Sequence, residues 1–145
     1  MNKALKISSP LILFIFLVPF NIVAQENDNQ RLIVLADMGN ETDEEQQLVH
    51  LLLSCNEFDL EGLIAVTGKY LRPESKNEYK QKLHPELFLK VINGYKNVWN
   101  KLLLHDNKYP SPEYLKSIVR TGQEGYGIAA TGKGLATEGS RLIID

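Results

Sequence analysis

The sequence lacks the features that would cross-link it or direct it to nucleic acid. Cys55 is the only cysteine, so no intrachain disulfide can form. Lys and Arg total 16 against 18 Asp and Glu, and no basic stripe alternates with aromatic residues, which argues against nucleic-acid binding. Cys55 continues the helical spacing of Leu48, Leu51 and Leu52. We therefore expect a buried structural thiol rather than a reactive one.

Long apolar runs are also scarce, and the prominent one lies at the N-terminus. Lys3 and Lys6 precede the apolar run 11–20, and the chain turns polar after Ala24. A run of this length is typical of a secretory signal peptide and short for a membrane span, although an uncleaved anchor is the alternative. The sequence therefore predicts a secreted or periplasmic protein that meets the membrane only through its signal segment.

This reading divides the chain into three parts. We expect residues 1–24 to be a signal peptide and residues 25–30 a polar leader. Residues 31–145 would then form one modest domain.

The most informative part of this domain is an acidic loop that follows a short apolar strand. Residues 32–36 are apolar, and five of the nine residues in 37–45 are acidic. The carboxyl end of a buried parallel strand is where open α/β sheets bind ligands. Carboxylates this close repel one another unless protons or a cation lie between them, and their oxygens suit calcium or magnesium. The alternative is a solvated acidic loop, because carboxylates also favour the start of a helix.

Hydrophobic periodicity predicts a β-α-β unit around this loop. Strands are expected at 32–36 and 60–67, with a helix between them from about Thr42 to Ser54. Thr42 and Glu45 have the Thr-x-x-Glu spacing of a capping box. Such a unit implies a parallel sheet and a right-handed crossover, which places the domain in the α/β class.

Two further helices are predicted downstream. A long helix is expected after Pro85, where apolar residues recur with the helical period up to Leu102. Another is expected after Ser111, which would cap it, with Pro112 at its first position. We expect the apolar faces of both helices to lie in the core.

The histidines form no site that the sequence reveals. His50, His84 and His105 share no metal-binding spacing. We therefore expect them at surface or capping positions.

The C-terminal part is rich in glycine and then turns apolar. Six glycines lie within the eighteen residues 122–139, which predicts a loop that bends sharply or approaches another group closely. A new apolar element starts at 141–145, where the sequence stops. Two predicted strands make a poor parallel sheet, so we expect this chain to be the front part of a longer protein.

Several of these segments together resemble a known family. The acidic loop Asp37-Met-Gly-Asn-Glu-Thr-Asp-Glu44 and the segment 58–67 resemble the opening of the inosine/uridine-preferring nucleoside hydrolases. More closely, the chain resembles a secreted bacterial branch of that superfamily, with a nucleoside-hydrolase-like domain sometimes labelled cellulose-binding. The further motifs of that branch are Tyr109-Pro-x-x-Glu113-Tyr-Leu, Gly122-x-x-Gly125-Tyr-Gly127 and Glu138-Gly-Ser140.

The resemblance covers residues 31–145 and reaches only the N-terminal part of the family's domain. It implies a Rossmann-like nucleoside hydrolase fold with a mostly parallel sheet, present here in incomplete form. It also implies an exported hydrolase that cleaves N- or O-glycosyl bonds with a calcium-activated water. The expected partner is a small-molecule glycoside or another carbohydrate.

The resemblance further assigns individual residues. Asp37, Asp43 and Glu44 would hold the calcium ion, and Asp37 would also be the general base for the water. Asn40, Asp43 and Glu138 would contact the sugar.

Two departures from the family pattern leave the activity open. Glu44 stands where the pattern has Asp, and Gly68-Lys69-Tyr70 stands where nucleoside hydrolases have an asparagine that contacts the sugar. Thr121 also occupies the place of a histidine at the start of the family's glycine-rich loop. The alternative is a non-catalytic carbohydrate-binding protein that keeps the pocket.

Overall fold

The computed structural model describes residues 29–144, so the expected signal peptide and all but the last two residues of the expected leader lie outside the described residues. Three strands and four α-helices make up the described part. The strands are β1 (Gln30–Ala36), β2 (Phe58–Ala65) and β3 (Val119–Thr121); the helices are α1 (Asp43–Leu53), α2 (Pro85–Leu102), α3 (Pro112–Ser117) and α4 (Glu138–Ile144); the 3-10 turns are η1 (Cys55–Glu57), η2 (Glu78–Gln81) and η3 (Ile128–Ala130).

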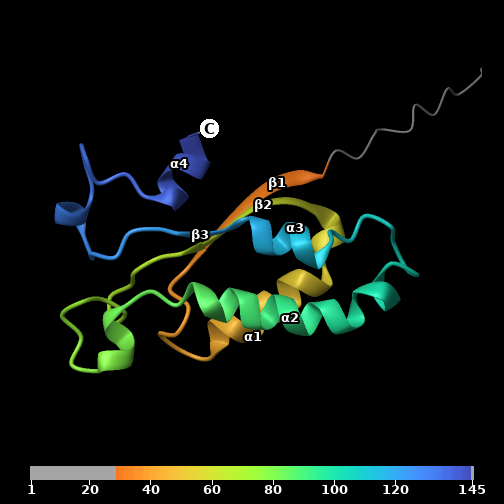
Figure 1. Ribbon diagram of the computed structural model, residues 1–145, viewed down its shortest axis with the longest axis horizontal. Helices are drawn as coiled ribbons and strands as arrows, with labels where there is room; N and C mark the ends of the chain where they lie inside the picture. The colour runs from red at the N-terminus through yellow and green to blue at the C-terminus, as the bar shows by residue number, and fades with distance from the viewer. Residues whose placement is uncertain (1–28, 145) are drawn as a thin grey trace, which may run out of the picture.

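The strands form one parallel sheet in the order β1-β2-β3. Helices α1 and α2 lie below the sheet in Figure 1, and α4 lies above it. Helix α4 packs closely on β2: a β-carbon at Gly62 of β2 would collide with the Leu142 side chain of α4. The expected α/β fold with a parallel sheet is thus confirmed. No helix among residues 29–144 is long and apolar enough to cross a membrane.

Strand β3 and helix α4 are elements that the sequence analysis did not name. Strand β3 has only three residues, Val119–Thr121, and pairs with Leu63–Ala65 of β2. Three residues are too few to display an alternating pattern. The apolar element expected at 141–145 is the second half of α4, which begins at Glu138.

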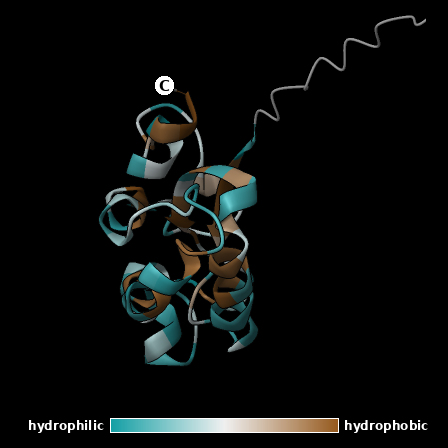
Figure 2. Cartoon of the chain, turned by 90° about the vertical axis from the view of Figure 1, so that its right-hand side faces the viewer, coloured by the Kyte–Doolittle hydropathy of each residue, from teal (hydrophilic) through white to brown (hydrophobic). Residues whose placement is uncertain are grey.

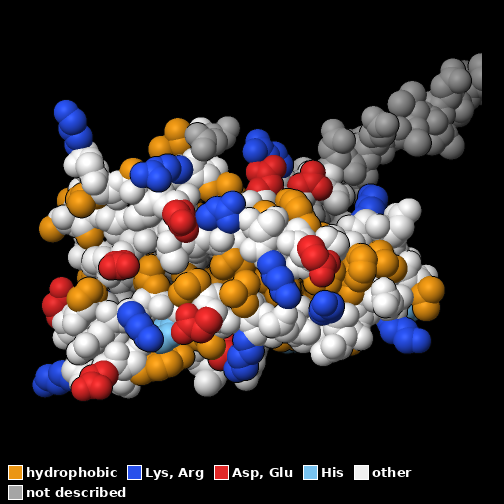
Figure 3. Space-filling model, viewed as in Figure 1, with side chains coloured by type: hydrophobic (Ala, Val, Ile, Leu, Met, Phe, Trp, Pro, Cys, Tyr) orange, Lys and Arg blue, Asp and Glu red, His pale blue; other side chains and the backbone are white. Residues whose placement is uncertain are grey.

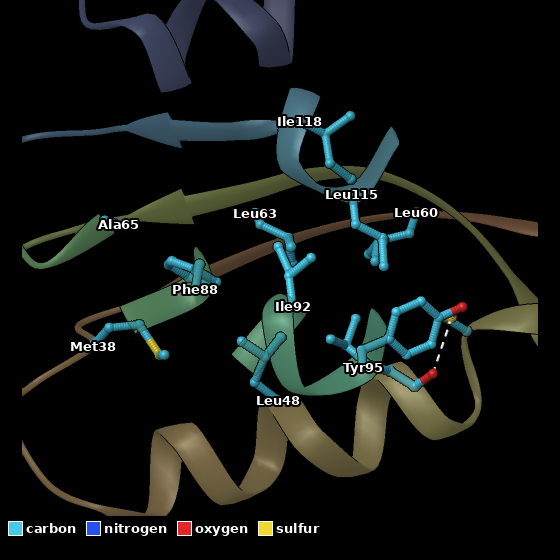
Figure 4. Close-up of a cluster of buried hydrophobic side chains, with 12 residues drawn as sticks. Met38, Leu48, Leu60, Leu63, Ala65, Phe88, Ile92, Tyr95, Leu115 and Ile118 are labelled. Atoms are coloured by element: carbon cyan, nitrogen blue, oxygen red, sulfur yellow. Dashed lines mark hydrogen bonds between the residues drawn. The ribbon is translucent and has the colours of Figure 1, made fainter. Parts of the chain in front are cut away.

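The core lies between the sheet and helices α1, α2 and α3. Ile92 of α2 points toward Leu63 of β2 in Figure 4, Phe88 of α2 lies on the same side of the sheet, and all three side chains are fully buried. Figure 2 shows that hydrophobic residues lie on the inner sides of the helices and hydrophilic residues on their outer sides. This confirms the expected apolar face of the long helix. The predicted cap of α3 is also confirmed, because Ser111 Oγ accepts a hydrogen bond from Tyr114 N at 3.1 Å.

Cys55 is a buried structural thiol, as expected. Its side chain is 1% exposed, and Sγ donates to the Leu52 carbonyl at 3.1 Å. The Tyr95 hydroxyl lies 3.8 Å from Sγ and donates to the Pro110 carbonyl at 2.9 Å. Burial raises the pKa of both groups, so the thiol stays protonated and unreactive near neutral pH.

We predict that Tyr95→Phe destabilises the protein by about 1 kcal/mol, because the partly buried Pro110 carbonyl loses its donor. Urea unfolding would measure the change. Tyr70→Phe is the matched control, since Tyr70 is 56% exposed. Equal stabilities of the two variants would contradict the assignment of this hydrogen bond to the core.

Candidate functional site

The three parallel strands end at one edge of the sheet, and hydrogen bonds hold together the loops that follow them. Val66 N donates to the Ala36 carbonyl at 3.0 Å, just past the end of β2. Gly122 N donates to the Ala65 carbonyl at 2.7 Å, and Thr67 N donates to the Gln123 carbonyl at 3.1 Å. This edge is where an open α/β sheet binds its ligand. The acidic loop predicted as the site starts here.

Asp37 is the first residue after β1 and is half-buried. Its carboxylate lies against Gly68, which follows β2: a β-carbon at Gly68 would overlap Asp37 Oδ2. Glycine at position 68 therefore makes room for Asp37. A side chain at position 68, such as that of an asparagine, would collide with the Asp37 carboxylate in this structure.

The acidic loop is shaped by a tight turn and not by the predicted capping box. Asn40 N donates to the Asp37 carbonyl at 3.0 Å, and Gly39 supplies the positive φ of 95° that the turn needs. Thr42 makes no side-chain capping hydrogen bond, so that prediction was wrong. Its backbone is already helical, whereas a capping residue is normally extended.

Two glutamates next to the turn have other partners. Glu44 Oε2 accepts a hydrogen bond from the Glu41 N–H at 3.1 Å. Glu45, the second residue of the predicted box, forms an ion pair with Lys90 at 2.7 Å. These contacts explain why the sequence motif does not act as a capping box.

The predicted metal ligands influence one another electrostatically. The pKa of Glu44 is raised, first by burial and further by the charges of Asp43 and Asp37. Yet no three His, Cys, Asp or Glu side chains within residues 29–144 are grouped so that they could hold a metal ion. Asp43 is exposed and accepts a long hydrogen bond of 3.5 Å from Gln47. The donor chemistry suits calcium, but the described residues do not bring three such ligands together.

The two other predicted sugar-contacting residues lie on different parts of this edge. Asn40 is on the acidic loop, where Oδ1 accepts a hydrogen bond from Lys80 Nζ at 3.2 Å. Glu138 begins α4, and its Oε2 accepts a hydrogen bond from the Thr121 hydroxyl at 3.1 Å. Thr121, which stands in the place of the family's histidine, is therefore tied to Glu138. The structure places Asp37 and Asn40 on the turn after β1 and Asp43 and Glu44 in the first turn of α1, while Glu138 lies beside the end of β3.

The glycine-rich segment confirms the predicted loop. Three of its six glycines, Gly127, Gly132 and Gly134, take positive φ values, and a β-carbon on any of them would meet nothing within 4 Å. These three glycines therefore bend the chain and do not mark a close approach. The opposite holds at Gly122, where a β-carbon would press on Val66 and the Ala65 carbonyl.

His84 lies next to this region, and only part of the expectation for it is confirmed. It occupies the N-cap position of α2, which is one of the two expected places, but its side chain is 1% exposed and makes no capping hydrogen bond. The ring stacks on Tyr79 with centroids 4.0 Å apart and lies so close to Gly39 that a β-carbon there would come within 2.7 Å. His84 thus supports the acidic loop from below.

Both ring nitrogens of His84 have partners. Nδ1 lies 2.7 Å from Glu86 Oε1, and Nε2 lies 2.6 Å from the Tyr79 carbonyl. Both partners are oxygen atoms that accept hydrogen bonds. The hydrogen bond and charge of His84 lower the pKa of Glu86 against the opposing effect of burial. No sequence pattern could have indicated that His84 is buried against the acidic loop, because His84 and Gly39 are distant in the chain.

A cavity of about 620 Å³ lies at the opposite end of the sheet, lined by residues that include Phe58, Asp59 and Tyr114. It surrounds the start of β2 rather than the carboxyl ends of the strands. None of the residues predicted to be functional lines it. The carboxyl edge is therefore the better candidate.

Comparison with known proteins identifies the family of this chain. The family model of the cellulose-binding Sde182, nucleoside hydrolase-like domain matches residues 31–145. A solved structure described as a nucleoside hydrolase-related hypothetical protein from Saccharophagus degradans, associated with carbohydrate metabolism, is 37% identical, with a TM-score of 0.69. The match covers 80% of this chain and 26% of that one, so this chain spans about a quarter of the length of that structure.

No curated protein matches the chain. The family model nevertheless covers the whole described domain, and the solved structure agrees with it in fold and sequence. The chain therefore belongs to the family of the cellulose-binding Sde182, nucleoside hydrolase-like domain.

Proposed function

We propose that this chain carries the acidic side of a glycoside site, and that the protein hydrolyses N- or O-glycosyl bonds outside the cytoplasm. One observation carries the proposal. The Asp37 carboxylate lies just past the end of β1 and fits against Gly68, in the loop that follows the neighbouring parallel strand. A carboxylate is thereby held at the edge where an α/β sheet binds its substrate.

Asp37 is the residue that would handle the proton in this reaction. As the water oxygen bonds to the anomeric carbon, the Asp37 carboxylate accepts a proton from that water. The glycosyl bond breaks, and its electron pair leaves with the base or the aglycone. Asn40 lies on the same loop and offers an amide to a sugar hydroxyl.

The substrate class and the location rest on separate support. The matching family is described as cellulose-binding, and the similar solved structure as associated with carbohydrate metabolism. These descriptions favour a carbohydrate substrate over other ligands of α/β sheets. Export is proposed on the pattern of residues 1–24 alone, which has the charged start and short apolar run of a signal peptide.

Calcium is a separate proposal. The family resemblance and the negative charges of Asp37 and Asp43 beside Glu44 favour a cation, although the described residues do not bring three ligands together. No step of the hydrolysis above is therefore assigned to the ion.

A non-catalytic carbohydrate-binding protein is the second candidate function. Glu44, which departs from the family's aspartate, is engaged by the Glu41 N–H and does not group with other ligands. The asparagine expected after the second strand is also absent. Both observations favour a pocket that keeps its carboxylates without positioning a water.

We predict that Asp37→Asn lowers the rate of glycoside hydrolysis by about 100-fold or more, because an amide cannot accept the proton. Carbohydrate affinity should change less. Release of reducing sugar would measure the first quantity and calorimetry the second. Asp59→Asn is the control, since Asp59 is exposed at the opposite end of β2. Unchanged hydrolysis in Asp37→Asn would contradict the proposal, whereas wild-type binding without any hydrolysis would establish the second candidate.

We predict that Asp37→Asn and Asp43→Asn each weaken calcium binding, because a cation relieves the repulsion in the acidic loop. Calcium titration by calorimetry would test this, again with Asp59→Asn as the control. Absence of binding by the wild type would remove calcium from the account and leave the role of Asp37 unchanged.

We predict that Gly68→Ala reduces hydrolysis or ligand affinity nearly as much as Asp37→Asn, because the added methyl displaces the Asp37 carboxylate. Gly94→Ala is the matched control: nothing lies within 4 Å of its added β-carbon, and helix α2 should gain about 0.5–1 kcal/mol. Circular dichroism would verify that both variants fold. Wild-type behaviour of Gly68→Ala would show that the position of Asp37 is not critical.

A further inference from the structure

A cavity with a basic lining borders the acidic loop. Lys69, Arg72, Lys76 and Lys80 line this space of about 490 Å³, together with Glu74. Four cationic side chains thus face one carboxylate, although the chain as a whole has a formal net charge of −2. We call this space the basic cavity.

The four cations of the basic cavity take part in none of the ion pairs of the described residues. Those pairs join Arg31 to Glu61, His84 to Glu86, Lys90 to Glu45 and Lys96 to Glu113. Like charges gathered around one space repel one another. Entry of an anion is therefore favoured.

The loop that carries these cations is held in a defined shape. Arg72 N donates to the Lys80 carbonyl at 2.8 Å, which brings the two ends of the loop together. Leu71 is fully buried, and its carbonyl accepts hydrogen bonds from Gly68 N at 3.0 Å and from the Thr67 hydroxyl. The basic side chains consequently project from a fixed backbone beside the end of β2.

Exposed aromatic rings accompany the cations. Tyr70 lines the basic cavity, and Lys69 Nζ lies 5.2 Å from the centre of its ring. Tyr126 of the glycine-rich loop is 51% exposed, with Arg72 Cζ 5.5 Å from its ring centre. Aromatic rings offer apolar faces on which a sugar ring can stack, and a guanidinium binds a planar anion through two parallel hydrogen bonds. The combination suits a sugar that carries a negative charge.

The basic cavity adjoins the candidate glycoside site through a single side chain. Lys80 lines the cavity and also donates to Asn40 Oδ1 of the acidic loop at 3.2 Å. In Figure 3, basic and acidic side chains lie close together at the lower left of the molecule, over the segment that contains η2. A saccharide of several units could occupy both places.

We propose that the basic cavity is a subsite for an anionic sugar residue, one that carries a carboxylate or a phosphate. Arg72 and Lys80 bind the anionic group, and Tyr70 and Tyr126 contact the sugar rings. This inference rests on the proposed function, because it extends the glycoside site by a neighbouring unit. It names an acidic carbohydrate as the substrate class. Cellulose is a neutral polymer and does not belong to that class.

Calorimetric titration of the full chain at low salt would test the subsite with four probes: trigalacturonate, a hexose phosphate, neutral cellotriose and a short single-stranded oligonucleotide. We expect one of the two anionic sugars to bind about tenfold or more tightly than cellotriose. The preference should vanish in Arg72→Gln/Lys80→Gln. It should persist in the control Lys101→Gln/Lys116→Gln, which removes the same charge outside the basic cavity. Added salt should weaken only the anionic probes.

Tighter binding of trigalacturonate assigns the anion as a carboxylate, and tighter binding of the hexose phosphate assigns it as a phosphate; both support the subsite. Equal binding of charged and neutral sugars would overturn the subsite and leave the glycoside site standing. Binding of no sugar at all would overturn both. Preference for the oligonucleotide over every sugar would assign the basic cavity to nucleic acid and likewise overturn the subsite.

Discussion

The candidate site depends on three parallel strands that end together. Past those ends, backbone hydrogen bonds from Val66 to Ala36 and from Gly122 to Ala65 continue the sheet by one step. They bring the acidic loop, the loop after β2 and the glycine-rich loop to one edge. Without this register, Asp37 would not meet Gly68 and the loops would have no common face.

A second layer of contacts holds the acidic loop from inside the molecule. His84 is buried beneath Gly39, stacks on Tyr79 and uses both ring nitrogens for hydrogen bonds. The loop beyond Gly68 is closed by a backbone hydrogen bond from Arg72 N to the Lys80 carbonyl. The acidic residues thus project from a supported backbone, next to basic residues supported in the same way. Such opposite charges side by side suit a ligand that has both hydroxyl and anionic groups.

The sequence predicted those elements whose signals are local and long enough to repeat. The β-branched run before Asp37 and the helical period from Phe88 onward correspond to β1 and α2, and Cys55 was rightly placed in the core. Strand β3 was not predicted, because three residues are too few to show an alternating hydrophobic pattern. The capping box failed because the backbone of Thr42 is helical, a property that residue type does not determine. His84 is buried against Gly39, a contact between distant residues that no local pattern encodes.

The central claim is that a carbohydrate binds at the carboxyl edge of the sheet, and amide chemical-shift mapping would test it most directly. An isotope-labelled chain would be titrated with a soluble oligosaccharide. The account predicts that the perturbed amides cluster in the loops after the three strands, around Asp37, Gly68 and Gly122. Perturbations confined to the opposite cavity, around Asp59 and Tyr114, would contradict it.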